Sequence, residues 1–377
     1  MYFGLSEEQV SLEETIKKYL EDNASLEVIK EIASGNHEKA EIIHRGLIDL
    51  GISGLLVPEK YGGLELDILF ASVVSSALGS GTAPVPFVGA YVMAPLALNL
   101  AGSKIQKEEW LPKIASGEAI IGLGLSEFIG AREDASINFD RDKISGRALF
   151  IIDGKDALAF ILSNKAGQLF IVDGNDPGIS KIELTTVDKT RPAMELLFKN
   201  VKAEILPGSK ENKEVINKVI DAGRIMLSAD TVGASQIMLD KAVAYSLERK
   251  QFGRQIGSFQ AVKHMCAEMV AELEPCHAML WHAAHCQEHI PNEARLMACH
   301  SKAHISEVGR QVSKTAIEVH GGMGFTDELG LHYWFKRIGL NRQLLGSPEL
   351  VREEAAKIQN FDQSPSKTEE VGHPLVV

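Results

Sequence analysis

The stretch Arg249–Gln260, RKQFGRQIGSFQ, joins two long predicted helices through a turn that contains glycine. Arginine, lysine and glutamine side chains make it rich in hydrogen-bond donors. Its composition alone is compatible with a solvated connection between helices. The alternative is an anion clamp, in which an arginine fork binds a pyrophosphate group while Phe252 and Gln260 pack against an attached ring system.

A second glycine-containing stretch, Glu318–Thr326, EVHGGMGFT, follows another predicted helix. A Gly-Gly-x-Gly sequence more often ends a helix than binds a ligand. It is not the Gly-x-Gly-x-x-Gly of a Rossmann unit, because no strand is predicted before it. Glycine does, however, let a backbone approach a phosphate closely, since it has no side chain.

Residues 1–118 read as helices. Ser6 is a plausible cap for an amphipathic helix that runs through Tyr19. The sequence Pro58-Glu59-Lys60-Tyr61-Gly62-Gly63 then breaks the helical pattern. We therefore expect a helical domain over residues 1–118.

Short apolar runs such as Ala159–Ser163 alternate with turn signals such as Asp153-Gly154-Lys155 over residues 119–210, which predicts a small β domain. Helical spacing returns over residues 211–360 and suits a bundle of four or five helices. Residues 361–377 are polar and contain proline, so we expect a flexible tail.

Composition narrows the class of protein. Hydrophobic residues make up 45% of the 377 and charged residues 24%, as in globular proteins. The net charge of −12 argues against nucleic acid as a partner. No apolar run reaches the roughly 18 residues that a membrane span needs, and the N-terminus does not read as a signal peptide. We expect a cytoplasmic protein without a membrane span.

One predicted helix carries His282, His285 and His289 on a single face, with Cys286 beside them. Three histidines so placed can bind zinc or iron. We instead expect them to form hydrogen bonds at a subunit interface, and we expect no metal. The four cysteines form no Cys-x-x-Cys pair, so neither a disulfide framework nor a zinc ribbon is indicated.

Taken together, Arg249–Gln260 and Glu318–Thr326 resemble two signature segments of the acyl-CoA dehydrogenase family, and weaker matches extend the resemblance along almost the whole chain. The resemblance implies a mainly α fold with a central β domain, a small barrel or sandwich, between an N-terminal helical domain and a C-terminal helical bundle. It also implies FAD as cofactor. The residues that it assigns to FAD are Arg249, Phe252, Gln260, Glu318, Gly321, Gly322 and Ser126.

In that family the two signature segments reach across a subunit interface to the pyrophosphate and adenosine of a neighbour's FAD. The resemblance therefore implies a homo- or hetero-oligomer, with a dimer of dimers expected. It further implies 2,3-dehydrogenation of an acyl-CoA substrate, with electrons passed to an electron-transfer flavoprotein.

The family's catalytic carboxylate has no counterpart at either of its usual positions. Leu345 stands where most members carry glutamate, and Gly223 stands where another branch carries it. Glu349 is a weak substitute candidate, and Glu127 and Asp230 are also conceivable. For each of these three carboxylates we favour an ordinary helix-face or cap position.

Two hypotheses follow from the missing base. In the first, the chain is a working dehydrogenase with an unrecognised base. In the second, it is a non-catalytic subunit of a heteromeric enzyme and completes the FAD site of a sister chain.

Overall fold

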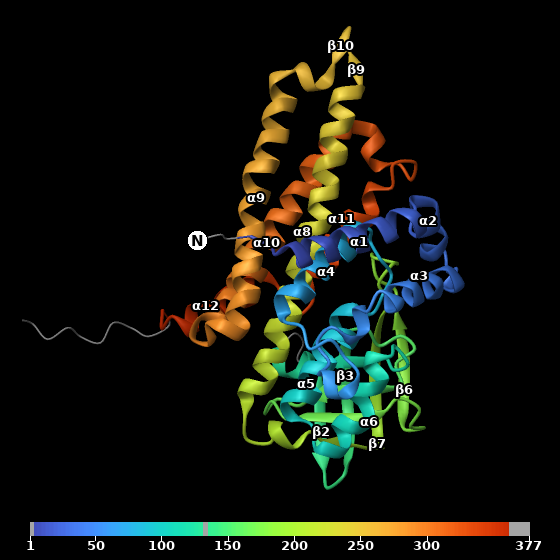
Figure 1. Cartoon of the computed structure of the whole chain (residues 1–377), viewed down its shortest axis with the longest axis vertical. Coiled ribbons are helices and arrows are strands. Elements are labelled where there is room, and N and C mark those ends of the chain that lie inside the picture. The colour runs from blue at the N-terminus through green and yellow to red at the C-terminus, as the bar shows by residue number, and fades with distance from the viewer. Residues whose placement is uncertain (1–3, 131–134, 362–377) are drawn as a thin grey trace, which may run out of the picture.

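The computed structural model describes residues 4–130 and 135–361, in which helices, strands and helices follow one another in the expected order (Figure 1). Apart from Phe361, the expected flexible tail lies outside the described residues.

A group of helices precedes the strands. These helices are α1 (Glu7–Asn23), α2 (Leu26–Ala33), α3 (His37–Asp49), η1 (Ile52–Gly54), η2 (Glu59–Tyr61), α4 (Ile68–Ser80), η3 (Phe87–Met93), α5 (Ala94–Ala101) and α6 (Lys104–Ala115). Ser6 caps α1 as predicted. Its hydroxyl accepts a hydrogen bond from the Gln9 N–H at 3.2 Å, and the Gln9 side chain accepts one from the Ser6 N–H at 2.9 Å. This reciprocal cap satisfies two amide groups that the helix itself leaves free.

The strands form two sheets. They are β1 (Ile121–Gly124), β2 (Ser136–Asp140), β3 (Lys143–Ile151), β4 (Ala159–Ser163), β5 (Leu169–Asp173), β6 (Ile179–Leu184), β7 (Ala193–Lys202) and β8 (Glu204–Ile205), with the short helix α7 (Ser126–Ile129) after β1. The sheet orders are β1-β4-β5-β8 and β2-β3-β7-β6. Phe160 and Phe170 of the first sheet share an apolar cluster with Ile144 and Phe198 of the second. The expected barrel or sandwich is thus a sandwich of two open sheets.

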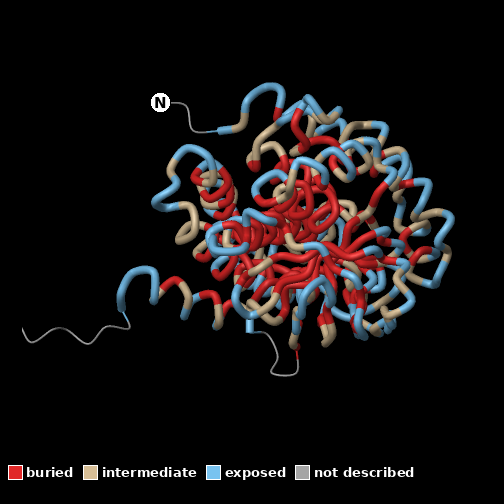
Figure 2. The backbone as a smooth tube through the Cα atoms, turned by 90° about the horizontal axis from the view of Figure 1, so that it is seen from below, coloured by how far each residue is buried: buried red, intermediate tan, exposed pale blue. Residues whose placement is uncertain are grey.

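The C-terminal helices form a bundle, as expected. They are η4 (Pro207–Ser209), α8 (Lys213–Glu248), η5 (Ile256–Ser258), α9 (Gln260–His289), α10 (Pro291–His320), η6 (Gly321–Phe325), α11 (Leu331–Gln343) and α12 (Pro348–Ile358). The helix α4 packs closely against α8 at Gly233, where the absence of a side chain permits the approach. A Cβ atom there would lie only 1.9 Å from the Ser76 carbonyl oxygen. Figure 2 shows the buried backbone in the middle of the molecule, with exposed segments around it.

Across residues 4–130 and 135–361, the helices are too short or too polar for any of them to cross a membrane.

A buried carboxylate joins the three parts of the fold. Asp230 of α8 accepts hydrogen bonds from Arg337 of α11 at 2.7 and 2.9 Å. It also accepts one from Arg191, in the loop between β6 and β7, at 3.0 Å. Arg337 in turn donates to the carbonyl oxygen of Ala83, just after α4, at 2.9 Å. The strand region, the N-terminal helices and the C-terminal bundle therefore meet at the ionic group formed by Asp230, Arg191 and Arg337.

Electrostatics favour the charged form of this group. Burial alone would raise the pKa of Asp230, but the charges of Arg337 and Arg191 outweigh it and hold the pKa below its ordinary value. The Asn341 side-chain amide adds a hydrogen bond to the carboxylate at 2.6 Å. The two buried arginines depend on this carboxylate, because an unpaired buried charge is costly.

We expect Asp230→Asn to destabilise the protein strongly, since it leaves Arg191 and Arg337 without their counter-charge. Breaking a buried ion pair in this way costs about 3–5 kcal/mol. Thermal and denaturant unfolding would measure the loss. The matched control is Asp240→Asn, on the exposed face of the same helix, where the carboxylate accepts a hydrogen bond from Gln236. Equal stability of the two variants would contradict the central role of Asp230.

Candidate functional site

The stretch Arg249–Gln260 forms the tip of an arm. The helix α8 ends at Glu248, and β9 (Lys250–Gln251) and β10 (Arg254–Gln255) form a short hairpin before α9 begins. Phe252 and Gly253 make its turn with φ angles of 53° and 77°. Figure 1 shows this tip at the opposite end of the molecule from the labelled strands β2, β3, β6 and β7.

The side chains of the tip divide into two groups. The Arg254 guanidinium lies 3.9 Å from the centre of the Phe259 ring, so it is engaged within the hairpin. Arg249 caps α8 through its backbone N–H, which donates to the Tyr245 carbonyl, and its side chain is exposed. Within the described parts of the chain, the Arg249 side chain has no hydrogen bond or ion pair. Phe252 is 92% exposed. Its ring also meets the Phe259 ring edge to face with centroids 6.2 Å apart, so most of its surface and the Arg249 side chain can contact another molecule.

The second signature stretch packs against α8 one turn before the tip. The helix α10 ends at His320, whose ring stacks on the Tyr245 ring of α8 with centroids 4.6 Å apart. Gly321 follows with φ 59° and ψ −138°, a conformation that is open essentially to glycine alone. A Cβ atom on Gly321 or Gly322 would meet nothing within 4 Å. The backbone here is therefore uncovered and can be approached closely.

The structure brings most of the sequence-predicted cofactor residues to one end of the bundle. We refer to this set as the clamp residues: Arg249, Phe252, Gln260, Glu318, Gly321 and Gly322. Gln260 is the first residue of α9, and Glu318 is exposed in the last turn of α10.

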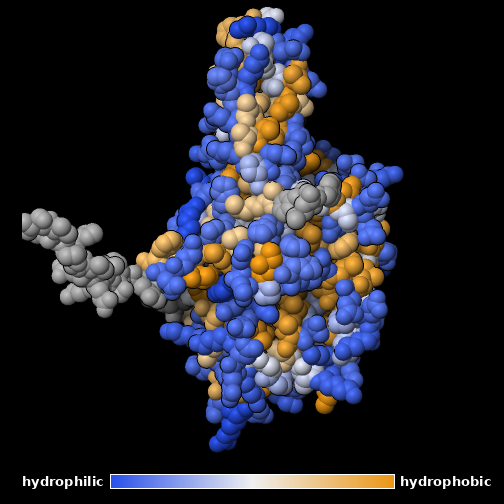
Figure 3. Space-filling view, turned by 60° about the vertical axis from the view of Figure 1, so that its left-hand side comes forward, coloured by the Kyte–Doolittle hydropathy of each residue, from blue (hydrophilic) through white to orange (hydrophobic). Residues whose placement is uncertain are grey.

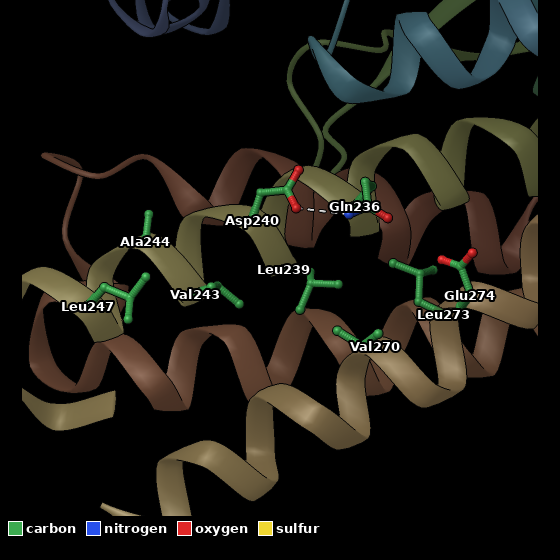
Figure 4. A pocket seen from close by; sticks show the side chains of 9 residues that line it. All are labelled: Gln236, Leu239, Asp240, Val243, Ala244, Leu247, Val270, Leu273 and Glu274. Atoms are coloured by element: carbon green, nitrogen blue, oxygen red, sulfur yellow. Dashed lines mark hydrogen bonds between the residues drawn. The ribbon is translucent and has the colours of Figure 1, made fainter. Parts of the chain in front are cut away.

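A shallow apolar groove runs along the arm below the tip. It lies between α8 and α9 and has a volume of about 380 Å³ (Figure 4). Leu239 and Leu273 form its buried wall, whereas Leu247 and Val270 are 57% and 45% exposed. Figure 3 shows hydrophobic side chains gathered on the projecting arm. Exposed apolar surface of this kind is typical of a contact with another chain.

Ser126 lies apart from the clamp residues. It begins α7, directly after β1, and its buried hydroxyl accepts a hydrogen bond from the Leu149 N–H of β3 at 3.0 Å. The hydroxyl therefore ties the loop after β1 to the second sheet. Residues 131–134, which follow α7 and Gly130, lie outside the described part of the chain.

Leu345 and Gly223, far apart in the sequence, face each other in space. A Cβ atom on Gly223 would lie 2.5 Å from the Leu345 Cδ1 and 2.6 Å from the Met93 Sδ. Leu345 is only 5% exposed and holds a φ of 57°, which is unusual for a branched side chain. The two positions at which the family resemblance implies a base thus meet in one apolar contact.

An ionic cluster missed by the sequence analysis lies beside this contact. Arg224 donates to the Leu345 carbonyl oxygen at 3.0 Å and pairs with Glu354 of α12 at 2.8 Å. Arg295 of α10 contacts Glu354 and Asp221. Burial raises the pKa of Asp221 to about 7, against the charges of Arg295 and Arg224. No sequence pattern marks this cluster, because its members come from α8, α10 and α12.

The other carboxylates weighed in the sequence analysis are engaged elsewhere. Glu349 is exposed at the start of α12, where hydrogen bonds from its own backbone N–H, Ser347 and Arg342 lower its pKa to about 2. A carboxylate with so low a pKa is a weak base near neutrality. Glu127 accepts a hydrogen bond from the Ile137 N–H at 2.6 Å, and Asp230 is held by its arginines.

The three histidines on α9 do not form one group. The rings of His285 and His289 lie 4.3 Å apart, whereas His282 contacts Cys286.

Comparison with known proteins places these features in a family. The model of the acyl-CoA dehydrogenase N-terminal domain matches residues 6–118, and that of the C-terminal domain matches residues 213–359. The probable acyl-CoA dehydrogenase YngJ of Bacillus subtilis is 28% identical, over 93% of this chain and 98% of its own length.

Two solved structures share the fold. The ChsE4-ChsE5 complex from Mycobacterium tuberculosis aligns with a TM-score of 0.86 and 23% identity, over 97% of this chain and 100% of its own. The FAD complex of PigA aligns with a TM-score of 0.84 and 21% identity, over 96% of this chain and 100% of its own.

We expect Gly321→Ala to distort the loop that follows α10, because alanine cannot adopt its φ and ψ without strain of about 1–3 kcal/mol. Hydrogen exchange of the Thr326 N–H, which donates to the Met323 carbonyl, would report the loosening. Gly322→Ala is the matched control, because Gly322 has no positive φ and an added Cβ would meet open space. Equal protection of the Thr326 N–H from exchange in the two variants would contradict the claim that the backbone conformation at Gly321 requires glycine.

Proposed function

The chain belongs to the acyl-CoA dehydrogenase family, and we propose that it acts in FAD-dependent 2,3-dehydrogenation of an acyl-CoA as the subunit that completes a sister chain's FAD site. One observation carries the proposal. The backbone at Gly321 and Gly322 is uncovered, whereas Leu345, at the position where the resemblance implies a base, packs with Met93 against Gly223.

The length of α8 separates the clamp residues from the contact between Gly223 and Leu345. Gly223 and Arg249 lie on the same helix, roughly 39 Å apart along its axis at 1.5 Å per residue. No side chain spans that distance. This separation supports the proposal that the clamp residues and the base position of one chain belong to two different sites, each completed by a second chain.

The clamp residues fit the anionic part of FAD. Arg249 has a free guanidinium that suits a pyrophosphate, and the uncovered backbone at Gly321 and Gly322 admits a close phosphate contact. Phe252 and Gln260 would pack beside the nucleotide. When bound, FAD supplies the acceptor for the hydride that leaves the acyl chain.

The chemistry also needs a carboxylate near the acyl carbon that loses a proton. At the two positions where the resemblance implies this carboxylate, the chain carries Leu345 and Gly223 instead. Loss of a positioned base typically slows such a step by about 10²- to 10⁴-fold. A sister chain with its own carboxylate would carry out this step.

The proposed partner is a related chain that docks along the arm. The groove between α8 and α9 exposes Leu247 and Val270 next to the tip, where such a contact would bury them. The fold occurs in a complex of two chains, ChsE4 and ChsE5. We propose a dimer of dimers, with an electron-transfer flavoprotein as the acceptor of electrons from FAD.

We expect Arg249→Ala to weaken FAD retention by the assembled oligomer. A hydrogen bond to a charged group contributes about 1.5–3 kcal/mol, which corresponds to a loss of roughly ten- to a hundredfold in affinity. Titration of the flavin-stripped oligomer with FAD would measure it by fluorescence.

The control is Arg310→Ala, which removes the same charge from an exposed position on α10. It should leave FAD affinity unchanged. If both variants bind FAD as tightly as the parent, Arg249 does not hold the cofactor.

A second candidate function is that of a dehydrogenase that supplies its own catalytic base. The environment of Asp221 favours this candidate. Its pKa of about 7 lies in the range useful for a general base, and it lies two residues before Gly223. However, its contact with Arg295 of α10 places it on a different side of α8 from the contact with Met93.

Anaerobic mixing of the isolated chain with acyl-CoA and FAD separates the two candidates. Under the proposal, flavin absorbance stays unchanged, because no carboxylate faces the substrate. Bleaching of the flavin that Asp221→Asn abolishes would instead support the second candidate.

A further inference from the structure

We propose that His282, Cys286 and Glu293 form a zinc-binding site at the turn between α9 and α10. Their ligand atoms, an imidazole nitrogen, a thiol sulfur and a carboxylate oxygen, all lie within 4.8 Å of one another. The site lies outside the clamp residues and the base position. It differs from the three-histidine set that the sequence spacing suggested, since His285 and His289 are not part of it.

The distances suit a tetrahedral ion. Zn–S and Zn–N bonds of about 2.3 and 2.0–2.1 Å place sulfur and nitrogen about 3.5 Å apart around zinc. The His282 Nε2 and Cys286 Sγ are separated by 3.5 Å, and the His282 Nε2 and Glu293 Oε2 by 3.8 Å. The Cys286 Sγ and a Glu293 carboxylate oxygen lie within 4.8 Å of each other, so a movement of the exposed Glu293 side chain would bring all three atoms to bonding distance of one ion.

The turn fixes the ligands before any ion arrives. His282 and Cys286 are one helical turn apart, so their side chains lie on the same face of α9. Only Ile290 separates α9 from α10, and its N–H donates to the Cys286 carbonyl oxygen while its own carbonyl accepts from the Glu293 N–H. Gln287 adds a hydrogen bond to the Ala294 carbonyl oxygen at 3.0 Å. Glu293 is thus held next to Cys286 by the backbone.

Donor chemistry selects the metal. A mixed nitrogen, sulfur and oxygen set suits zinc, whereas calcium and magnesium prefer oxygen ligands alone. Cys286 is fully buried, but the His282 and Glu293 side chains are 36% and 54% exposed. An ion can therefore enter from solvent, and water can provide the fourth ligand.

The position of the site indicates a structural role. The helix α9 starts at the arm tip with Gln260, and α10 ends at the clamp loop with His320. Both helices meet at the proposed site, about 45 Å from the clamp residues at 1.5 Å per residue over thirty residues. An ion there would fix the two helices relative to each other at the end remote from the clamp.

The test uses full-length protein stripped of metal with a chelator and then titrated with Zn²⁺ or Co²⁺. We expect one equivalent to bind, a thiolate-to-cobalt charge-transfer absorption with Co²⁺, and a rise in the melting temperature that saturates at one equivalent. Glu293→Gln, at an exposed position, should keep the fold and weaken binding at least about tenfold. Cys286→Ser should abolish the charge-transfer absorption.

His285→Ala is the matched control, because it removes an imidazole from the same helix outside the site, and it should bind zinc as the parent does. Asp67, Glu288 and His289 form a neighbouring group that offers nitrogen and oxygen but no sulfur. If His289→Ala abolishes binding while Glu293→Gln leaves it unchanged, the ion belongs to that group and the proposal is wrong. Absence of stoichiometric binding by the parent protein would overturn it as well.

Discussion

The buried carboxylate of Asp230 is the interaction on which the arrangement of this chain depends. It neutralises Arg337 of α11 and Arg191 of the strand region, and Arg337 also reaches the end of α4 through the Ala83 carbonyl. Because these groups are buried, none of them can be satisfied by water, and each fixes the position of the element that carries it. The strands, the N-terminal helices and the bundle are therefore oriented around one point in the middle of α8.

That point divides α8 into two functional halves. The N-terminal half carries Gly223 and Arg224, which contact Leu345 and its carbonyl oxygen. The C-terminal half projects beyond the body of the molecule and is followed directly by Arg249. The long helix holds these two groups far apart, which is why our proposal assigns them to two different sites shared with a second chain. In our account, the apolar contact at Leu345 leaves one site without a base, and the clamp residues serve the neighbouring site.

The sequence predicted the order of the three regions, the cap at Ser6 and the strand Ala159–Ser163, because each is signalled by local pattern or turn chemistry. It did not reveal β6, whose residues are mostly exposed and show no alternation. It also could not show that Gly223 faces Leu345, or that Glu293 approaches His282 and Cys286, since these contacts join different elements. The clamp residues were found through resemblance, but their distance from Ser126 is visible only in the fold.

The most direct test of this account is the amount of FAD bound per chain, measured by flavin absorbance. The measurement is made on the chain purified alone and on its complex with a related chain. That related chain carries a glutamate at one of the two base positions that the family uses. The account predicts a colourless protein alone and a yellow complex in which the partner's base performs the reaction. Stoichiometric FAD in the chain purified alone would contradict it.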